Sequence, residues 1–409
     1  MNFIVTPQKK LWLAIAVSAL GYFVDVYDIV LFSVLRVPSL KSLSLSDEQI
    51  TTVGLFLINL QLLGMLIGGL VWGALGDKRG RLSVLFGSII LYSTANLANA
   101  FVTNVEQYAV LRFIAGFGLA GELGAAITLV SELMSKEKRG YGTTIITTAG
   151  VFGGVAGGLV GNLFSWQTAY IIGGCAGFVL LFLRFRITES ALFTRIKSHE
   201  KIKKGSLWFF IKSPKLLLKY IKCLFIGVPF WIFVGLFLSL SPEIGKALGI
   251  LTPISAGWTI LFFNIGLGLG DMSSGLLSQF WGSRKKVVAC FLLLSLVSSL
   301  LILSFRDISA ERFYCFCILC GFGAGYWAVF NMIATEQFGT NFRATVAVSL
   351  PNFVRGMAVP ASLILGLLKP QLGILWGVGS IMTASLVLAL ISLHSLEETF
   401  ARTLEFVEN

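Results

Sequence analysis

Apolar residues recur along the chain in runs of about 20 residues or more, separated by short polar stretches. A helix of about 20 apolar residues is long enough to cross the hydrocarbon core of a bilayer. Lipid offers no hydrogen-bond partner to bare backbone, so each run is expected to be helical. The pattern predicts an all-α membrane protein with twelve transmembrane helices, at residues 11–36, 50–75, 83–103, 106–134, 141–163, 167–188, 219–241, 254–281, 286–306, 309–337, 343–369 and 371–394.

Composition and charge favour a membrane protein over a nucleic-acid-binding one. Of the 409 residues, 56% are hydrophobic and 13% are charged, whereas about a quarter of a soluble chain is charged. The formal net charge is +12, but the basic residues stand in short stretches between apolar runs, as at 78–81, 136–139 and 284–286. That distribution is typical of cytoplasmic loops. We expect a lipid bilayer as partner and no nucleic acid.

The distribution of Lys and Arg also predicts the orientation. With the N-terminus inside, 24 of the 32 basic residues fall in cytoplasmic segments, which places both termini in the cytoplasm. The first apolar run is long enough to span, and no small-residue cleavage site follows a short apolar core, so it is predicted to be a retained helix. We expect a monomeric multi-pass protein of the cell membrane, typical of a bacterial inner membrane.

The two halves of the chain resemble each other weakly. The stretch "GALGDKRGR" at 73–81 corresponds to 275–283, 202 residues later, and "SELMSKEKRG" at 131–140 corresponds to 335–344, 204 residues later. A repeat of half the chain length is typical of transporters built from two helix bundles around a central site. The prediction is an N-terminal six-helix bundle (1–188), a cytoplasmic linker (189–218) and a C-terminal six-helix bundle (219–409).

Several stretches resemble a known family. Residues 73–81 are similar to the loop signature G-x-x-x-D-x-x-G-R of the major facilitator superfamily. Further stretches resemble its metabolite–proton symporter branch, which carries organic acids, betaines and shikimate. The matching residues are Gly21, Tyr27, Asp28, Arg112, Gly116, Gly121, Glu122, Glu189, Phe193, Glu336, Phe338, Thr340, Arg343 and Asn352. The sequence departs from the branch pattern at Asp25, Val26 and Leu123, where substrate would bind.

Three acids within the spans are candidates for proton coupling: Asp25, Asp28 and Glu122. Asp25 and Asp28 share one helix face. Two acids at membrane depth repel each other, so one is expected to hold a proton. Asp28 is favoured because it matches the family's own aspartate. The alternatives are that an aspartate only hydrogen-bonds to neighbouring helices and that Glu122 belongs to a structural ion pair.

Of the arginines in the predicted spans, Arg112 and Arg355 lie farthest from a span end, and both are candidates for binding a substrate carboxylate. The rival role of Arg112 is to pair with an acid of the first span, and that of Arg355 is to pair with Asp271. Other polar or aromatic residues expected to line the cavity are Tyr27, Trp258, Asn264, Asp271, Tyr326, Asn331 and Asn352.

Charged residues at the cytoplasmic ends of the spans are predicted to form gates. They can form charge networks and oppose helix ends when the carrier is closed on that side. These gate candidates are Asp77, Arg81, Glu132, Arg139, Glu336 and Arg343.

Enzymatic chemistry is not indicated. The sequence has no P-loop, no nucleophile–base pair and no metal constellation, so no cofactor, metal or catalytic residue is expected. Cys317 and Cys320 form a C-x-x-C, but no histidine or second pair is close, which favours apolar packing over metal or redox chemistry.

The sequence therefore predicts a proton-coupled secondary transporter that imports a small organic anion, a carboxylate or hydroxycarboxylate, by alternating access. Two alternatives remain at this point. One is proton-driven efflux of amphipathic or cationic compounds, and the other is a membrane sensor that binds a ligand without transporting it.

Overall fold

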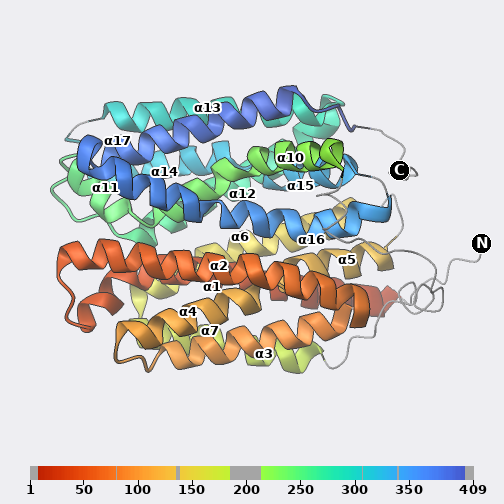
Figure 1. The fold of residues 1–409 in the computed structure, drawn as a ribbon, viewed down its shortest axis with the longest axis horizontal. Helices are drawn as coiled ribbons and strands as arrows, with labels where there is room; N and C mark the ends of the chain where they lie inside the picture. Colours follow the sequence, from red (N-terminus) through yellow and green to blue (C-terminus); the bar gives the residue numbers. More distant parts are fainter. Residues whose placement is uncertain are drawn as a thin grey trace, which may run out of the picture.

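The structure is a computed structural model that describes residues 8–79, 81–134, 139–184, 213–305, 307–338 and 340–400. These ranges are helical apart from short connections (Figure 1). The helices are α1 (Gln8–Ser42), α2 (Asp47–Arg79), α3 (Arg81–Asn99), α4 (Val105–Leu119), α5 (Glu122–Leu133), α6 (Arg139–Leu163), α7 (Trp166–Arg184), α10 (Pro214–Ile232), η1 (Phe233–Leu238), α11 (Ser241–Ala247), α12 (Ala256–Phe280), α13 (Arg284–Ser304), α14 (Ala310–Ala324), α15 (Trp327–Glu336), α16 (Thr340–Gly356) and α17 (Ala358–His394).

Within the described ranges, eleven helical segments are long and apolar enough to cross a bilayer. The last of them, Ser349–His394, has 46 residues, which is roughly 69 Å of helix against a hydrocarbon core of about 30 Å. Its backbone leaves the helical conformation at Gly373, with φ 73° and ψ 171°. The predicted spans 343–369 and 371–394 are the two limbs on either side of this bend. The prediction of an all-α membrane fold is confirmed.

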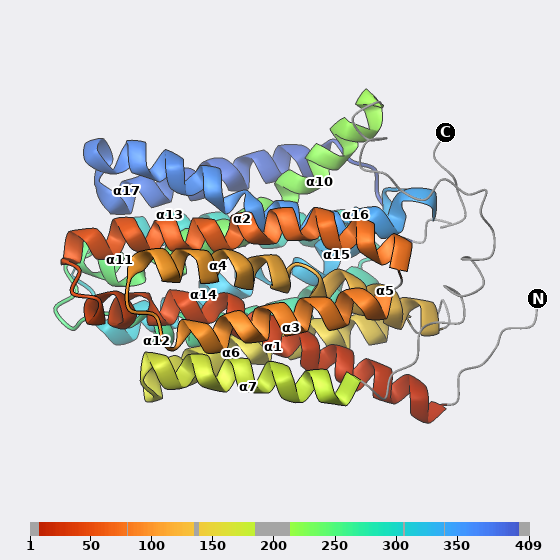
Figure 2. The same ribbon diagram turned by 60° about the horizontal axis from the view of Figure 1, so that its bottom comes forward.

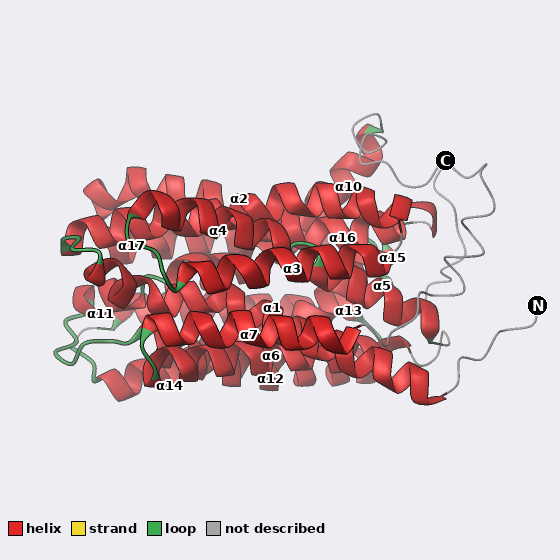
Figure 3. Cartoon of the chain, turned by 90° about the horizontal axis from the view of Figure 1, so that it is seen from below, coloured by secondary structure: helices red, strands yellow, loops and turns green. Residues whose placement is uncertain are grey.

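The helices of the two halves of the chain lie in two groups. Figure 1 shows α1–α7 together in its lower part and α10–α17 together in its upper part. The long helices run along the long axis, so that the loops lie at the two ends (Figure 2 and Figure 3). The start of α1 and the end of α17 lie at the same end of the bundle. The predicted division at 189–218 falls mostly in residues 185–212, outside the described ranges.

Two spans are interrupted at corresponding places in the two halves. The fourth predicted span stops at Leu119 and resumes at Glu122, and the tenth stops at Ala324 and resumes at Trp327. The glycines at these breaks, Gly121 and Gly325, are 204 positions apart, the same offset as the weak sequence repeat. At Gly325 a side chain would collide with the backbone of α12. Glycine there lets two helices pack closely, as small residues do between membrane helices.

Candidate functional site

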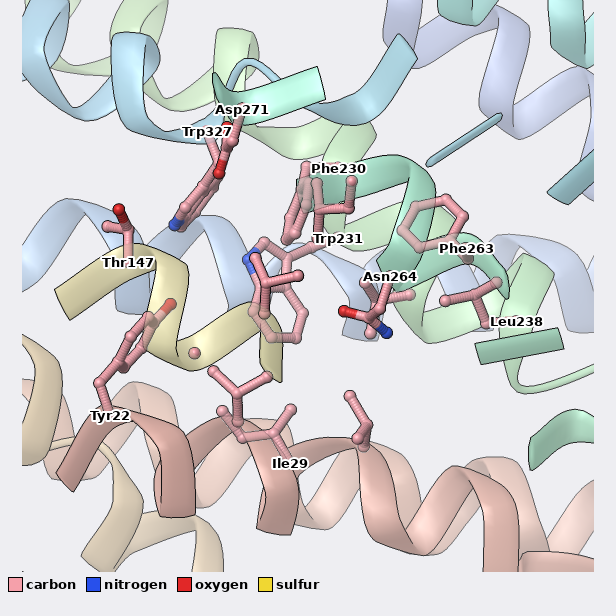
Figure 4. A pocket seen from close by; sticks show the side chains of 16 residues that line it. Tyr22, Ile29, Thr147, Phe230, Trp231, Leu238, Phe263, Asn264, Asp271 and Trp327 are labelled. Carbon is pink, nitrogen blue, oxygen red and sulfur yellow. The ribbon is translucent and has the colours of Figure 1, made fainter. Parts of the chain in front are cut away.

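A cavity lies between the two groups of helices (Figure 4). Residues of α1 and α6 line one side, and residues of α10, η1, α12 and α15 line the other. It encloses about 550 Å³ of space between atoms, a figure that includes its open mouth. Its walls are mainly apolar. The residues that present polar atoms to it are Tyr22, Thr147, Trp231, Asn264, Asp271 and Trp327.

Aromatic side chains from the C-terminal half form one wall of the cavity. The rings of Phe230 and Trp327 stack with centroids 4.7 Å apart, and Trp231 meets both of them edge-on. Two residues after Trp231 the α-helix changes to the π-helical turn η1. Such turns are often found at functional sites. Flat rings held in this way offer a planar surface to a flat ligand.

Arg355 lies behind this wall and joins the two halves. Its guanidinium is 5.1 Å from the ring centre of Trp231, close enough for a cation–π interaction. Its Nη2 lies 3.5 Å from Oδ2 of Asp25 on α1. Both side chains are almost completely buried. The structure therefore pairs Arg355 with an acid of the opposite half, and the predicted alternative of an Arg355–Asp271 pair is not what it shows.

Asp271 instead lies on the cavity wall against the start of α15. Its Oδ1 accepts a hydrogen bond from the backbone N–H of Ala328 at 3.3 Å. The first N–H groups of a helix have no partner within the helix, so a carboxylate there is stabilised without an arginine. This contact is the physical reason why Asp271 does not need Arg355 as a partner, the alternative considered from the sequence.

Asp28 and Arg112 lie together inside the N-terminal half. Arg112 donates to Asn96 at 2.8 Å and to Gln61 at 3.4 Å, and it is the cation that acts on Asp28. This arrangement fits the alternative in which Arg112 is associated with an acid of the first span. Neither residue lines the cavity described above.

Glu122 is held in a buried ion pair with Arg184, at the end of α7. Arg184 Nη1 donates to Oε2 of Glu122 at 2.9 Å and to the carbonyl oxygen of Leu85 at 3.0 Å. The side chains of Glu122 and Arg184 are 0% and 1% exposed. This geometry favours a structural ion pair for Glu122, one of the two roles considered from the sequence. Sequence reasoning missed Arg184, because it ends a span and resembles a loop residue.

Most of the other predicted cavity residues point elsewhere. The hydroxyl of Tyr27 donates to the carbonyl of Ala169, and that of Tyr326 donates to the carbonyl of Ile226. These hydroxyl groups therefore connect neighbouring helices, and the two tyrosines do not line the cavity. Trp258 is 39% exposed and does not line the cavity either.

The three predicted asparagines differ in position. Asn264 lines the cavity, and its amide also donates to Ile260 of its own helix. Asn331 donates to Trp327 within α15. Asn352 donates to the carbonyl of Ala120 across the two halves at 3.2 Å, beside the interruption of the fourth span.

The two ends of the bundle carry different charge pairs. At the end where α1 begins, Glu336 pairs with Arg284 at 2.7 Å. The side chains of the other gate candidates, Asp77, Arg81, Glu132, Arg139 and Arg343, lie outside the described part of the structure.

At the opposite end, Arg36 of α1 donates to Glu243 of α11 at 2.8 Å. Arg36 also donates to the carbonyl of Ser239 at 2.8 Å, and the hydroxyls of Ser33 and Ser239 are 2.7 Å apart. These contacts join the two halves. Sequence reasoning missed this pair, because Arg36 is the last residue of the predicted first span, where a charged side chain is not unusual.

A bundle of membrane-crossing helices with a cavity between two halves and charge pairs across them defines a membrane transporter. The chain belongs to the Major Facilitator Superfamily, whose family description matches residues 11–349. It is thus a multi-pass membrane protein and a secondary transporter of a small-molecule substrate, not an enzyme.

Similar proteins include bacterial transporters of small metabolites. A Bacillus subtilis (strain 168) protein assigned as the niacin/nicotinamide transporter NiaP is 27% identical, with 89% of each chain covered. The benzoate transport protein of Acinetobacter baylyi is 25% identical over 82% of this chain and 78% of its own. The 4-hydroxybenzoate transporter PcaK of Pseudomonas aeruginosa is 36% identical over 35% of this chain and 33% of its own.

Solved structures support the fold. The crystal structure of a D-xylose–proton symporter superposes with a TM-score of 0.71 at 15% sequence identity, covering 97% of this chain and all of the other. At this level of identity the similarity shows the architecture and not the substrate.

Proposed function

We propose that this protein imports a small aromatic carboxylate together with a proton. The observation that carries the proposal is Arg355, a buried arginine stacked on Trp231 at the aromatic wall of the cavity between the two halves. An arginine next to flat rings is suited to a ligand with a planar ring and a carboxylate. The guanidinium can bind the carboxylate bidentately, and the rings can stack on the ligand.

The ring and the carboxylate of such a ligand would contact different residues. Phe230 and Trp327 stack on each other and line the cavity, and a ligand ring paired with them would gain about 0.5–1.5 kcal/mol beyond the area it buries. The carboxylate needs a fixed cation away from bulk water, and Arg355 is 1% exposed. Relatives named for niacin, benzoate and 4-hydroxybenzoate transport carry ligands of this shape.

Efflux of cationic compounds is the second candidate, because one acid lies on the cavity wall. Asp271 presents a carboxyl group to the cavity, and a cationic ligand would meet it there. Alternatively, the carboxyl group of Asp271 binds a proton and not a cationic ligand.

Reconstituted vesicles test these functions. Labelled benzoate and labelled nicotinate should accumulate inside when an inward proton gradient is imposed, and an uncoupler that collapses the gradient should abolish accumulation. Arg355→Ala is the matched control, because it removes the proposed carboxylate partner while leaving the aromatic wall. Outward pumping of a cationic dye instead of benzoate uptake would support efflux. Tight binding with no flux would support a sensor.

A further inference from the structure

The ion pair between Asp25 and Arg355 is loose. The atoms Nη2 and Oδ2 are 3.5 Å apart, longer than the 2.7–2.9 Å of a charge-assisted hydrogen bond. In the described part of the structure, both carboxylate oxygens of Asp25 and both Nε and Nη2 of Arg355 lack hydrogen-bond partners. Arg355 therefore has donors to spare for a second carboxylate.

The pair also joins the two moving halves of the transporter. Asp25 is on α1 and Arg355 is on α16, which lie in the two different groups of helices (Figure 1). Any rearrangement of one half against the other changes the distance between these two residues. Two other buried acid–arginine associations differ in this respect, because Asp28 with Arg112 and Glu122 with Arg184 lie within the N-terminal group.

Other charges near Asp25 are already engaged. Glu122 of α5 acts on Asp25 but is neutralised by Arg184 of α7. On the same helix, Asp28 lies one turn further on, and Arg112 of α4 acts on it. Across the cavity, Asp271 accepts from the start of α15. Arg355 is the cation in contact with Asp25, so loss of Arg355 leaves Asp25 as a buried carboxylate without a salt bridge.

We propose that substrate and proton are coupled by an exchange of partners at Arg355. The substrate carboxylate displaces Asp25 from the guanidinium, and the released Asp25 takes up the proton. A buried charge without a partner costs several kcal/mol, and protonation removes that cost. This proposal rests on the proposed function, and it names Asp25 as the coupling group.

The step balances in charge and atoms. One ion pair, Arg355 with Asp25, is broken, and one ion pair, Arg355 with the substrate carboxylate, is formed. One O–H bond forms on Asp25 with a proton from water. Release on the opposite side reverses the step, so one proton accompanies each monocarboxylate and the loaded carrier has the charge of the empty one.

Trp231 lies between this pair and the cavity. Its indole lines the cavity (Figure 4), and the guanidinium of Arg355 lies 5.1 Å from its ring centre. In the described part of the structure, its indole nitrogen has no hydrogen-bond partner. The exchange therefore requires this ring to shift from its edge-on contacts with Phe230 and Trp327.

The pH dependence of binding tests the exchange. Benzoate is an anion at pH values well above the ordinary carboxyl pKa of about 4. If one proton is taken up per benzoate, the Kd of the wild-type protein rises about tenfold per pH unit between about pH 6 and pH 8. Asp25→Asn should bind benzoate with the same Kd across this range, at least tenfold more tightly than wild type at about pH 8. It should exchange labelled for unlabelled benzoate without accumulating it.

Asp28→Asn is the matched control. It makes the same chemical change one turn away without touching Arg355, so its Kd should still depend on pH. Loss of the pH dependence in Asp28→Asn and its retention in Asp25→Asn would overturn the proposal.

A second measurement uses the unmodified protein. Benzoate added to purified wild-type transporter in weakly buffered solution at about pH 8 should take up about one proton per molecule bound, as read by a pH-sensitive dye. Binding with no proton uptake would sink the exchange while leaving the proposed function standing. Absence of benzoate and nicotinate binding to the wild-type protein would remove the proposed function itself.

Discussion

At the scale of single residues, charges inside the membrane take their roles from their partners. Asp25, Asp28 and Glu122 have the same chemistry in the sequence but meet three different surroundings. Asp25 faces an arginine of the opposite half, Asp28 lies near Arg112, and Glu122 is fixed by Arg184. Only the first of these pairs is placed so that relative movement of the halves changes it.

The planar fork of Arg355 should matter as much as its charge. Lysine keeps the charge but cannot bind a carboxylate bidentately or stack on Trp231 in the same way. Arg355→Lys should weaken benzoate binding roughly ten- to a hundredfold, since hydrogen bonds to charged groups contribute about 1.5–3 kcal/mol. Titration calorimetry of the purified variant measures this. A Kd equal to that of the wild type would exclude Arg355 from the substrate site.

Glu122 is expected to contribute mainly to stability. Glu122→Gln leaves Arg184 buried without a carboxylate, which costs about 3–5 kcal/mol when a buried pair is broken. The thermal unfolding midpoint in detergent should fall, and the double variant Glu122→Gln with Arg184→Leu should recover part of it. A normal midpoint together with a loss of proton-driven uptake would instead make Glu122 a coupling residue.

At the scale of secondary-structure elements, breaks in helices position the site. The interruption at Gly325 and the π-helical turn after Trp231 fall in spans that line the cavity. Helix ends expose backbone groups, and Asp271 uses one of them at α15. The elements thus supply polar backbone where an unbroken helix would have none.

The segment after α17 caps the start of α13. The carboxylate of Glu398 accepts from the backbone N–H groups of Arg284 and Lys285 and from the hydroxyl of Ser283, at the start of α13. Partial burial raises the pKa of Glu398, but the hydrogen bonds from Ser283, Phe400, Arg284 and Lys285 outweigh it. They hold the pKa below its ordinary value of 4.5.

Glu398→Gln should therefore lower the stability of the C-terminal half modestly, by roughly 0.5–1 kcal/mol for an exposed cap. Because the folded pKa is lowered, the contribution is fully present above about pH 4.5 and is lost as the pH falls through the lowered value. Thermal unfolding of wild type and variant should differ at neutral pH and converge in acid. A difference that persists unchanged in acid would contradict this role.

At the scale of the whole molecule, polar contacts as well as packed helices join the two halves. At the end of the bundle opposite the start of α1, Arg36 contacts Glu243 and Ser33 contacts Ser239. Alternating access requires these contacts to open when that side of the cavity opens.

A cross-link at this end should stop transport. Ser33→Cys with Ser239→Cys replaces two hydroxyls whose oxygens are 2.7 Å apart by thiols that can form a bond of about 2.05 Å. Oxidation should abolish benzoate uptake and reduction should restore it. Each single variant, treated in the same way, is the control. Full uptake by the oxidised and cross-linked double variant would show that this end does not open.

The sequence alone determined the fold class, the positions of the spans and the family. These follow from apolar run length and local motifs, which are properties of neighbouring residues. It also identified Asp25, Asp28, Glu122, Arg112 and Arg355 as buried charges, because charge at membrane depth is rare and costly, but it missed Arg36 and Arg184 near the ends of spans. It placed Arg355 and Asp25 within spans without showing that they meet.

Only the tertiary structure decided which charges pair and which rings face the cavity. The pairing of Asp25 with Arg355 and that of Glu122 with Arg184 depend on how distant helices rotate and cross. The direction of a side chain around a helix is fixed by packing, and in a span with little amphipathic pattern the sequence carries little of that information. The aromatic wall, Phe230, Trp231 and Trp327, therefore appeared only when α10 and α15 were brought together.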